Sequence, residues 1–156
     1  MMDEVRPIHV LAATPEHAAY IADMHGALFE RAWDAEGVRR LLEHPASVAL
    51  VAQIGSAAHP AGFAMAHLTA DEMEILSVGV RRDWHRQGIG RALVAGLIDV
   101  ARPRDVKRVF LDVAESNVAA VALYSGLGFT GMGRRKNYYS HADGTREDAL
   151  LMVHEM

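Results

Sequence analysis

Apolar residues recur along this chain with two periods, and each period predicts a different kind of element. Short runs in which apolar residues are continuous, or alternate with polar ones, predict β-strands. These runs lie at residues 8–13, 47–54, 61–68, 73–80, 108–114, 129–135 and 148–155. The segment GSAAHP separates the second run from the third, so these two runs predict an antiparallel hairpin.

Other stretches carry apolar residues at intervals of three and four, which predicts helices. They span residues 15–29, 35–44, 89–102 and 117–128. Asp34 is a favourable N-cap residue for the second of these helices, and Pro103 stops the third.

The predicted order of elements is β-α-α-β-β-β-α-β-α-β-β. Antiparallel strands come first and βα units follow, which predicts an α/β (α+β) sandwich. Its central sheet is mixed and mostly antiparallel, with helices on both faces. The chain has 156 residues and no internal repeat, low-complexity segment or linker, so residues 1–156 predict a single domain.

Composition narrows the function classes. A formal net charge of −4 provides no general basic surface, so we expect no nucleic-acid partner. The absence of cysteine excludes disulfides, thiolate zinc sites and a thiol nucleophile, and it fits a reducing cytoplasm. The nine histidines are scattered without metal-ligand spacing, so we expect no metal. No long apolar run is present, so we expect neither a signal peptide nor a membrane span.

The stretch RRDWHRQGIGRALVAGLIDVAR, residues 81–102, gathers four arginines around a Gly-Ile-Gly turn where a helix begins. A helix N-terminus presents unpaired N–H groups and positive potential, and glycine lets a phosphate approach the backbone. A P-loop is excluded because Arg91-Ala92 follow Gly90. A dinucleotide fingerprint needs a third glycine where Leu93 stands, and the antiparallel first half does not suit that fold. The pyrophosphate arm of coenzyme A fits both the motif and its context.

The segment ILSVGVRRDWHRQGIGRALV strongly resembles the acetyl-CoA segment of the GNAT superfamily of N-acetyltransferases. The superfamily signature Gln/Arg-x-x-Gly-x-Gly/Ala matches from Gln87 onward, whereas His85 departs from it. FLDVAESNVAAVALYSGLGF resembles the second half of the family core. RRKNYYSHADGTREDALLMVHEM resembles the RimI-type enzymes, which acetylate the N-terminal alanine of a ribosomal protein. The resemblance implies a three-layer GNAT-like sandwich.

The resemblance also assigns roles to residues. Acetyl-CoA is expected at Val78, Gly79, Val80, Arg86, Gln87, Gly88, Ile89, Gly90, Arg91 and Asn117. Tyr124 is expected to be the general acid and Asp112 the general base, with Glu74 and Glu115 as alternatives for the base. Asp112 stands where the RimI-type pattern typically has glutamate, so a water is an alternative to direct proton transfer. Tyr138 and Tyr139 are expected beside the acceptor groove.

The implied activity is transfer of an acetyl group from acetyl-CoA to the N-terminal alanine α-amine of a polypeptide such as a ribosomal protein. The implied location is the cytoplasm. Two alternatives remain at this point. One is an acetyltransferase that acts on a small-molecule amine, and the other is a non-catalytic acyl-CoA sensor.

Overall fold

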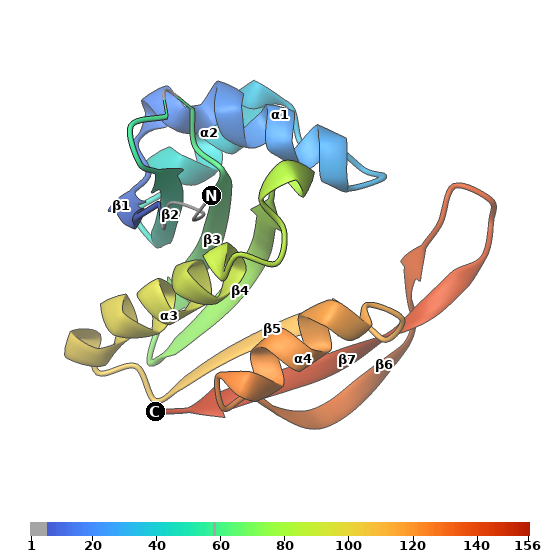
Figure 1. Ribbon diagram of the computed structural model, residues 1–156. Coiled ribbons are helices and arrows are strands. Elements are labelled where there is room, and N and C mark those ends of the chain that lie inside the picture. Colours follow the sequence, from blue (N-terminus) through green and yellow to red (C-terminus); the bar gives the residue numbers. More distant parts are fainter. Residues whose placement is uncertain (1–5, 58) are drawn as a thin grey trace, which may run out of the picture.

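The computed structural model describes residues 6–57 and 59–156, and these residues form one seven-stranded sheet with four α-helices (Figure 1). The strands are β1 (Ile8–Ala12), β2 (Ser47–Ile54), β3 (Gly62–Thr69), β4 (Glu72–Val80), β5 (Arg108–Ala114), β6 (Thr130–Ser140) and β7 (Arg146–Glu155). The helices are α1 (Ala18–Leu28), α2 (Ala35–Glu43), α3 (Ile89–Ala101) and α4 (Val118–Gly126). None of these described helices is long and apolar enough to cross a membrane.

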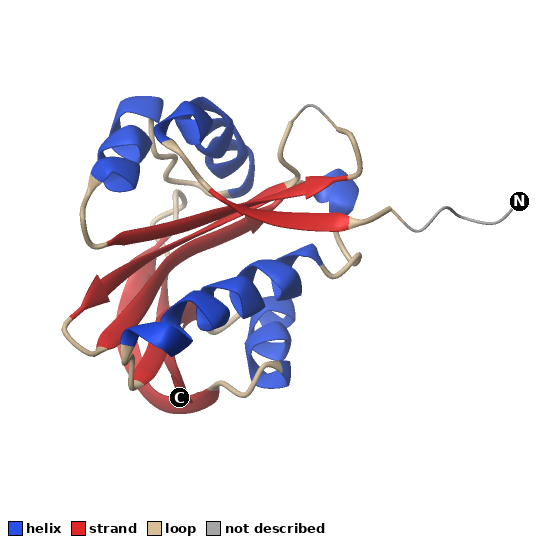
Figure 2. Ribbon diagram, turned by 90° about the vertical axis from the view of Figure 1, so that its left-hand side faces the viewer, coloured by secondary structure: helices blue, strands red, loops and turns tan. Residues whose placement is uncertain are grey.

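The sheet separates two apolar cores, and Figure 2 shows helices on both of its sides. The smaller core lies under α1 and α2, where alternate residues of β2 and β3, such as Val51 and Phe63, meet Ile21. The larger core lies under α3 and α4 and includes Leu97 and Leu111. This arrangement confirms the predicted sandwich, because a strand buried on both faces directs successive side chains into opposite layers.

The strands run in the order β1-β2-β3-β4-β5-β7-β6, and every neighbouring pair except β4–β5 is antiparallel. The parallel pair is short, since it joins only residues 72–74 to residues 108–110. Beyond this contact the two strands separate, as Figure 1 shows. Leu76 is an extra residue in β4, because Ser77 and Ile75 pair with the consecutive residues Met65 and Ala66. The split between β4 and β5 creates the space for a site.

The predicted element order is confirmed, and the last hairpin differs most from expectation. We predicted its strands at residues 129–135 and 148–155, whereas β6 continues to Ser140 and β7 begins at Arg146. The first nine residues of β6 are exposed, so its outer part shows no alternation of apolar and polar residues. The register is irregular between Arg135 and Tyr139, where Asn137 adopts a positive φ of 52°. Backbone pairing, rather than burial, extends this hairpin.

Candidate active site

The turn between β4 and α3 is built to bind an anion. The chain leaves β4, forms a short 3₁₀ turn at Arg82–Trp84 and enters α3 through Gly88, whose φ is 80°. Within the described residues, the backbone N–H groups of residues 86–91 have no acceptor, and no side chain caps α3. These free donors and the helix dipole favour a negative group. Arg86 and Arg91, both exposed, add positive charge.

His85, which departs from the family signature, has a structural contact in this turn. Its Nε2 lies 2.7 Å from the carbonyl oxygen of Val80, the last residue of β4. Trp84 packs against the larger core, with the guanidinium of Arg6 over its ring. Together these contacts hold the loop against the end of β4 and leave the donors of residues 86–91 free.

The start of α3 lies beside α4. A Cβ atom added at Gly90 would come 3.4 Å from Leu123, and one added at Gly126 would come 3.5 Å from the guanidinium of Arg91. Arg91 therefore reaches the C-terminal end of α4. The predicted anion site and the predicted residues of α4 belong to one region of the molecule.

The edge of β4 offers a second set of free backbone groups. From Ile75 to Val80 this strand pairs with β3 on one side and, among the described residues, with no strand on the other. Alternate residues of such an edge present N–H and C=O groups that an extended ligand can bind as a strand would. Residues 78–80, predicted from the resemblance to pair with the pantetheine arm, lie on this edge.

A cavity of about 530 Å³ lies where β4 and β5 separate. Its lining comes from the end of α1 and the loop after it, from β4, β5 and α4, and from the β6–β7 hairpin. Several lining residues have side chains that can transfer protons or bind polar groups. They include His25, Glu30, Arg31, Asp112, Asn117, Tyr124, Tyr139, His141 and Glu147. The structure thus brings together Asp112, Asn117 and Tyr124, as predicted from sequence.

Tyr124 and Asn117 reach this cavity from the same helix. Asn117 caps α4 through its side-chain oxygen, which accepts from the N–H of Ala120 at 3.2 Å. Tyr124 is 8% exposed and contacts Phe129, with ring centroids 5.6 Å apart. Burial raises the pKa of Tyr124 to about 12. The phenol therefore stays protonated at neutral pH and can donate a proton or a hydrogen bond.

Asp112 lies on the sheet face opposite its buried neighbours, as its alternation with Leu111 and Val113 predicted. Its Oδ1 accepts a hydrogen bond of 2.9 Å from Nε of Arg135. The Tyr139 hydroxyl donates to the backbone carbonyl of Asp112 at 3.1 Å. These contacts fix the position of a carboxylate at the wall of the cavity, where a general base is required.

Other predicted residues lie outside the cavity. Glu74 is exposed on β4, and Glu115 forms a 2.7 Å ion pair with Arg134. Of the three carboxylates considered as the base, only Asp112 lines the cavity. Tyr138 is 52% exposed and does not line it, although its neighbour Tyr139 does. The two rings contact edge to face, with centroids 4.9 Å apart, but only Tyr139 reaches the cavity.

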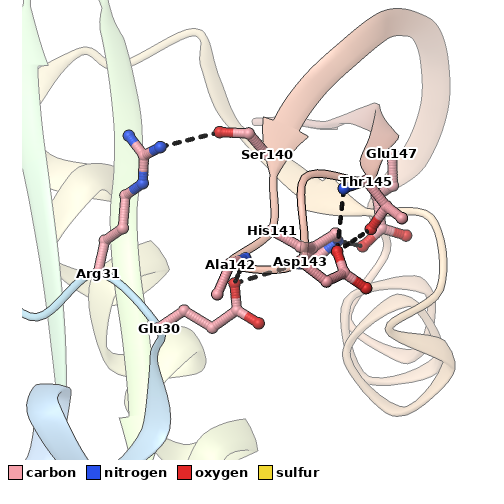
Figure 3. Close-up of polar contacts among 8 residues, drawn as sticks. All are labelled: Glu30, Arg31, Ser140, His141, Ala142, Asp143, Thr145 and Glu147. Carbon is pink, nitrogen blue, oxygen red and sulfur yellow. Dashed lines mark hydrogen bonds and ion pairs between the residues drawn. The ribbon is translucent and has the colours of Figure 1, made fainter.

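Sequence reasoning missed a group of polar residues that also line the cavity. His141 lies between Glu147, 3.1 Å from its Nε2, and Glu30, 3.4 Å from its Nδ1 (Figure 3). We call Glu147, His141 and Glu30 the carboxylate–histidine chain. Arg31 adds a 2.9 Å hydrogen bond to the hydroxyl of Ser140. These contacts connect the loop after α1 to the β6–β7 hairpin, and no spacing in the sequence signals them.

An aromatic group that was also missed forms the wall near α1. The ring of His25 stacks on Trp33, with centroids 4.2 Å apart, and on Phe29, at 4.5 Å. Burial lowers the pKa of His25, and its Nδ1 accepts the backbone N–H of Trp33 at 3.2 Å. His25 is therefore a neutral, hydrogen-bonded part of the wall. The described residues contain no group of three or more His, Asp or Glu placed to hold a metal.

These features define the class of protein. The chain matches the Acetyltransferase (GNAT) family over residues 18–129, and it belongs to that family. The resemblance stated from sequence is thereby confirmed.

Individual relatives within the family show in more detail what this chain is similar to. Over 93 residues the chain is 46% identical to the [ribosomal protein bS18]-alanine N-acetyltransferase of Escherichia coli strain K12. That match covers 60% of this chain and 62% of the relative, slightly less than two-thirds of its length. The crystal structure of the ribosomal-protein-S18-alanine N-acetyltransferase from Escherichia coli superposes with a TM-score of 0.86. The superposition has 29% identity and covers 96% of this chain and 94% of the other.

A plant structure shows how widely the fold extends. Arabidopsis thaliana NAA60 in complex with acetyl-CoA has a TM-score of 0.84 at 20% identity, with 96% of this chain and 99% of that chain covered. At this identity the likeness shows the fold alone.

Proposed function

We propose that this protein transfers an acetyl group from acetyl-CoA directly to the α-amine of a polypeptide that begins with alanine. One observation carries the proposal. A row of free backbone donors on β4 and the α3 turn leads into a cavity lined by a protonated phenol, Tyr124, and a fixed carboxylate, Asp112. Binding of an acyl-CoA alone would need the donors and not this acid–base pair.

The residues of the cofactor end fit acetyl-CoA. The N–H groups of residues 86–91, with Arg86 and Arg91, suit the pyrophosphate. The open edge at residues 78–80 suits the amide groups of the pantetheine arm. A side chain at Gly88 would meet nothing within 4 Å, so the backbone there is open to a ligand. When bound, acetyl-CoA supplies the acetyl group as an activated thioester.

The residues of the cavity then divide the proton transfers. Asp112, directly or through a water, accepts a proton from the attacking nitrogen. N–H groups on the free edge of β4 stabilise the negative charge that develops on the acetyl oxygen. Tyr124 donates its proton to the departing sulfur. Tyr124 is assigned the donor role because its raised pKa keeps the phenol protonated at neutral pH.

Three considerations support a polypeptide terminus as the acceptor. An α-amine has an ordinary pKa of about 8, against about 10.4 for lysine, so a modest base suffices for it. The 46% identity to a protein named for the N-terminal alanine of ribosomal protein bS18 favours the same class of acceptor. The net charge of −4 suits a basic partner. This acceptor would place the enzyme in the cytoplasm, where ribosomal proteins are made.

The test offers the purified protein acetyl-CoA and a set of acceptors: peptides with a free or blocked N-terminus, starting with alanine or with a bulky residue, and spermidine. Mass spectrometry locates the acetyl group. We expect turnover on the free alanine terminus. Turnover of spermidine, or of a lysine in a blocked peptide, with none on the alanine terminus would reject the proposed acceptor. Binding of acetyl-CoA without turnover of any amine would indicate an acyl-CoA sensor.

A further inference from the structure

The carboxylate–histidine chain lines the cavity, and the exposure of its side chains increases from Glu147 through His141 to Glu30. Glu147 lines the cavity, its side chain is 19% exposed, and its Oε2 accepts the N–H of Ser116 at 3.1 Å. Its Oε1 lies 3.1 Å from Nε2 of His141, and Nδ1 of His141 lies 3.4 Å from Oε2 of Glu30. The Glu30 side chain is 55% exposed. Figure 3 shows Glu30 and Glu147 on either side of His141. Both ring nitrogens therefore face a carboxylate, one on the less exposed Glu147 and one on the more exposed Glu30.

The proposed reaction produces one proton that must leave the site. An acceptor terminus arrives mostly as an ammonium ion at neutral pH, since its pKa is about 8. Its nitrogen loses two protons in becoming an amide, and the departing sulfur takes up one. One proton per turnover is therefore released to solvent.

The groups already assigned do not provide that exit. Asp112 is hydrogen-bonded to the guanidinium of Arg135, which has only donors and cannot accept a proton. Tyr124 is buried and gives its proton to the sulfur. A second proton acceptor with access to solvent is needed, and the carboxylate–histidine chain has both properties.

We propose that Glu147, His141 and Glu30 form a proton relay from the acceptor amine to solvent, an inference that rests on the proposed function. The ammonium passes a proton to the Glu147 carboxylate, which transfers it through Oε1 to the free Nε2 of neutral His141. The imidazolium then releases its Nδ1 proton to Glu30 or to water. Glu147 and His141 end in their original charge states. The second proton, which Asp112 takes from the nitrogen after attack, replaces the one that Tyr124 gave to the sulfur, so every group is ready for another turnover.

The charges around His141 suit this role. Glu147 on β7 and Glu30 after α1 contact its ring, and Asp143 in the hairpin turn lies close enough to be affected by its charge. The hydrogen bond to Glu147 is the largest of the effects that raise the pKa of His141 above 6.5. Tyr139 and Arg31 also line the cavity, and Arg31 bonds to Ser140, the residue before His141. The raised pKa of His141 brings its proton affinity closer to that of the amine.

The test compares kcat/KM for the alanine-terminal peptide in the wild type and in His141→Gln between about pH 6 and pH 9.5. The ratio of the wild-type value to the variant's should rise and then fall with pH, reaching about ten-fold at its maximum. At pH values below the raised pKa of His141 the wild-type imidazole is already protonated, so the ratio falls there. Above pH 9 the amine arrives unprotonated and needs no relay. Asp112→Asn should instead lose activity across the whole range, because the proton it takes leaves only after attack.

A second measurement separates proton transfer from a structural role. Added imidazole should restore much of the activity of His141→Ala at pH 7.5, because it replaces the missing proton acceptor. His9→Gln, an exposed substitution on β1, is the matched control and should behave as wild type. A pH-independent ratio without imidazole rescue would overturn the relay while the proposed function stands. A wild type that acetylates no amine would overturn both.

Discussion

The two ends of the site recognise polar groups by different means. At the cofactor end, residues 86–91 offer backbone N–H groups, and a single short segment supplies them all. At the acceptor end, side chains from four parts of the chain meet: the loop after α1, β5, β6 and β7. Arg31 and Ser140 touch there although 109 positions separate them.

This difference has a physical consequence. Backbone donors at a glycine-rich turn depend on local conformation, so most side-chain changes nearby leave them in place. The acceptor end depends on specific ion pairs and hydrogen bonds, such as those of Asp112 and His141. We therefore expect the cofactor end to tolerate most neutral side-chain changes, and the acceptor end to be adjustable one side chain at a time.

Tyr124 lies where the two ends meet, and its change should have the largest effect. Tyr124→Phe removes the proton donor, so the single-turnover rate should fall by about 10²–10⁴-fold. Affinity for acetyl-CoA and for the peptide should stay within about two-fold, because the backbone donors are untouched. Rapid-quench and calorimetric measurements would check both. Since the pKa of Tyr124 is about 12, the wild type should show no loss from its ionisation until the pH approaches that value.

The stability of Tyr124→Phe provides a direct control for its fold. Within the described residues, burial alone raises the pKa of Tyr124, and no hydrogen bond contributes to it. Removing the hydroxyl should therefore change the free energy of unfolding by less than about 1 kcal/mol. An unchanged single-turnover rate in the folded variant would assign Tyr124 to packing against Phe129.

At position 90, the affinity for acetyl-CoA should depend more on the charge of the side chain than on its size. A Cβ there would make an ordinary contact of 3.4 Å with Leu123, so Gly90→Ala should bind acetyl-CoA within about three-fold of wild type. Gly90→Glu places a negative charge beside the phosphates and should weaken binding by about 10–100-fold. Glutamate in the first turn of a helix is favourable for the fold, so lost binding would not reflect unfolding. Equal affinities of the three proteins by calorimetry would contradict this placement.

The contrast between the two ends also explains what the sequence could predict. The anion turn is contiguous, so its arginines and glycines are visible together in residues 81–102. Asp112 was placed correctly because strand alternation fixes its face. Asn117 and Tyr124 are two helical turns apart and share a face, as their common cavity shows.

The acceptor end was largely invisible for the opposite reason. Glu30 and His141 meet only after the sheet has formed, across 111 positions, and neither belongs to a periodic pattern. The outer part of β6 is exposed, so burial gives it no signature, and its irregular register could not be anticipated. Adjacent tyrosines suggested one shared surface, and their rings do contact edge to face, but only Tyr139 lines the cavity.

The tyrosine pair provides the smallest and most local test of the comparison. Tyr139 lines the cavity and its hydroxyl bonds to the carbonyl of Asp112, whereas Tyr138 lies outside against Arg135. Tyr139→Ala should raise KM for the peptide by about five- to ten-fold, and Tyr138→Ala by less than two-fold, with acetyl-CoA affinity unchanged in both. Tyr139→Phe keeps the ring and loses the hydrogen bond, so its KM for the peptide should lie between those of the two alanine variants. Steady-state kinetics with the alanine-terminal peptide would show the order. A larger effect at Tyr138 would mean that the acceptor runs along the outer face of the hairpin and that the cavity wall at Tyr139 serves Asp112 alone.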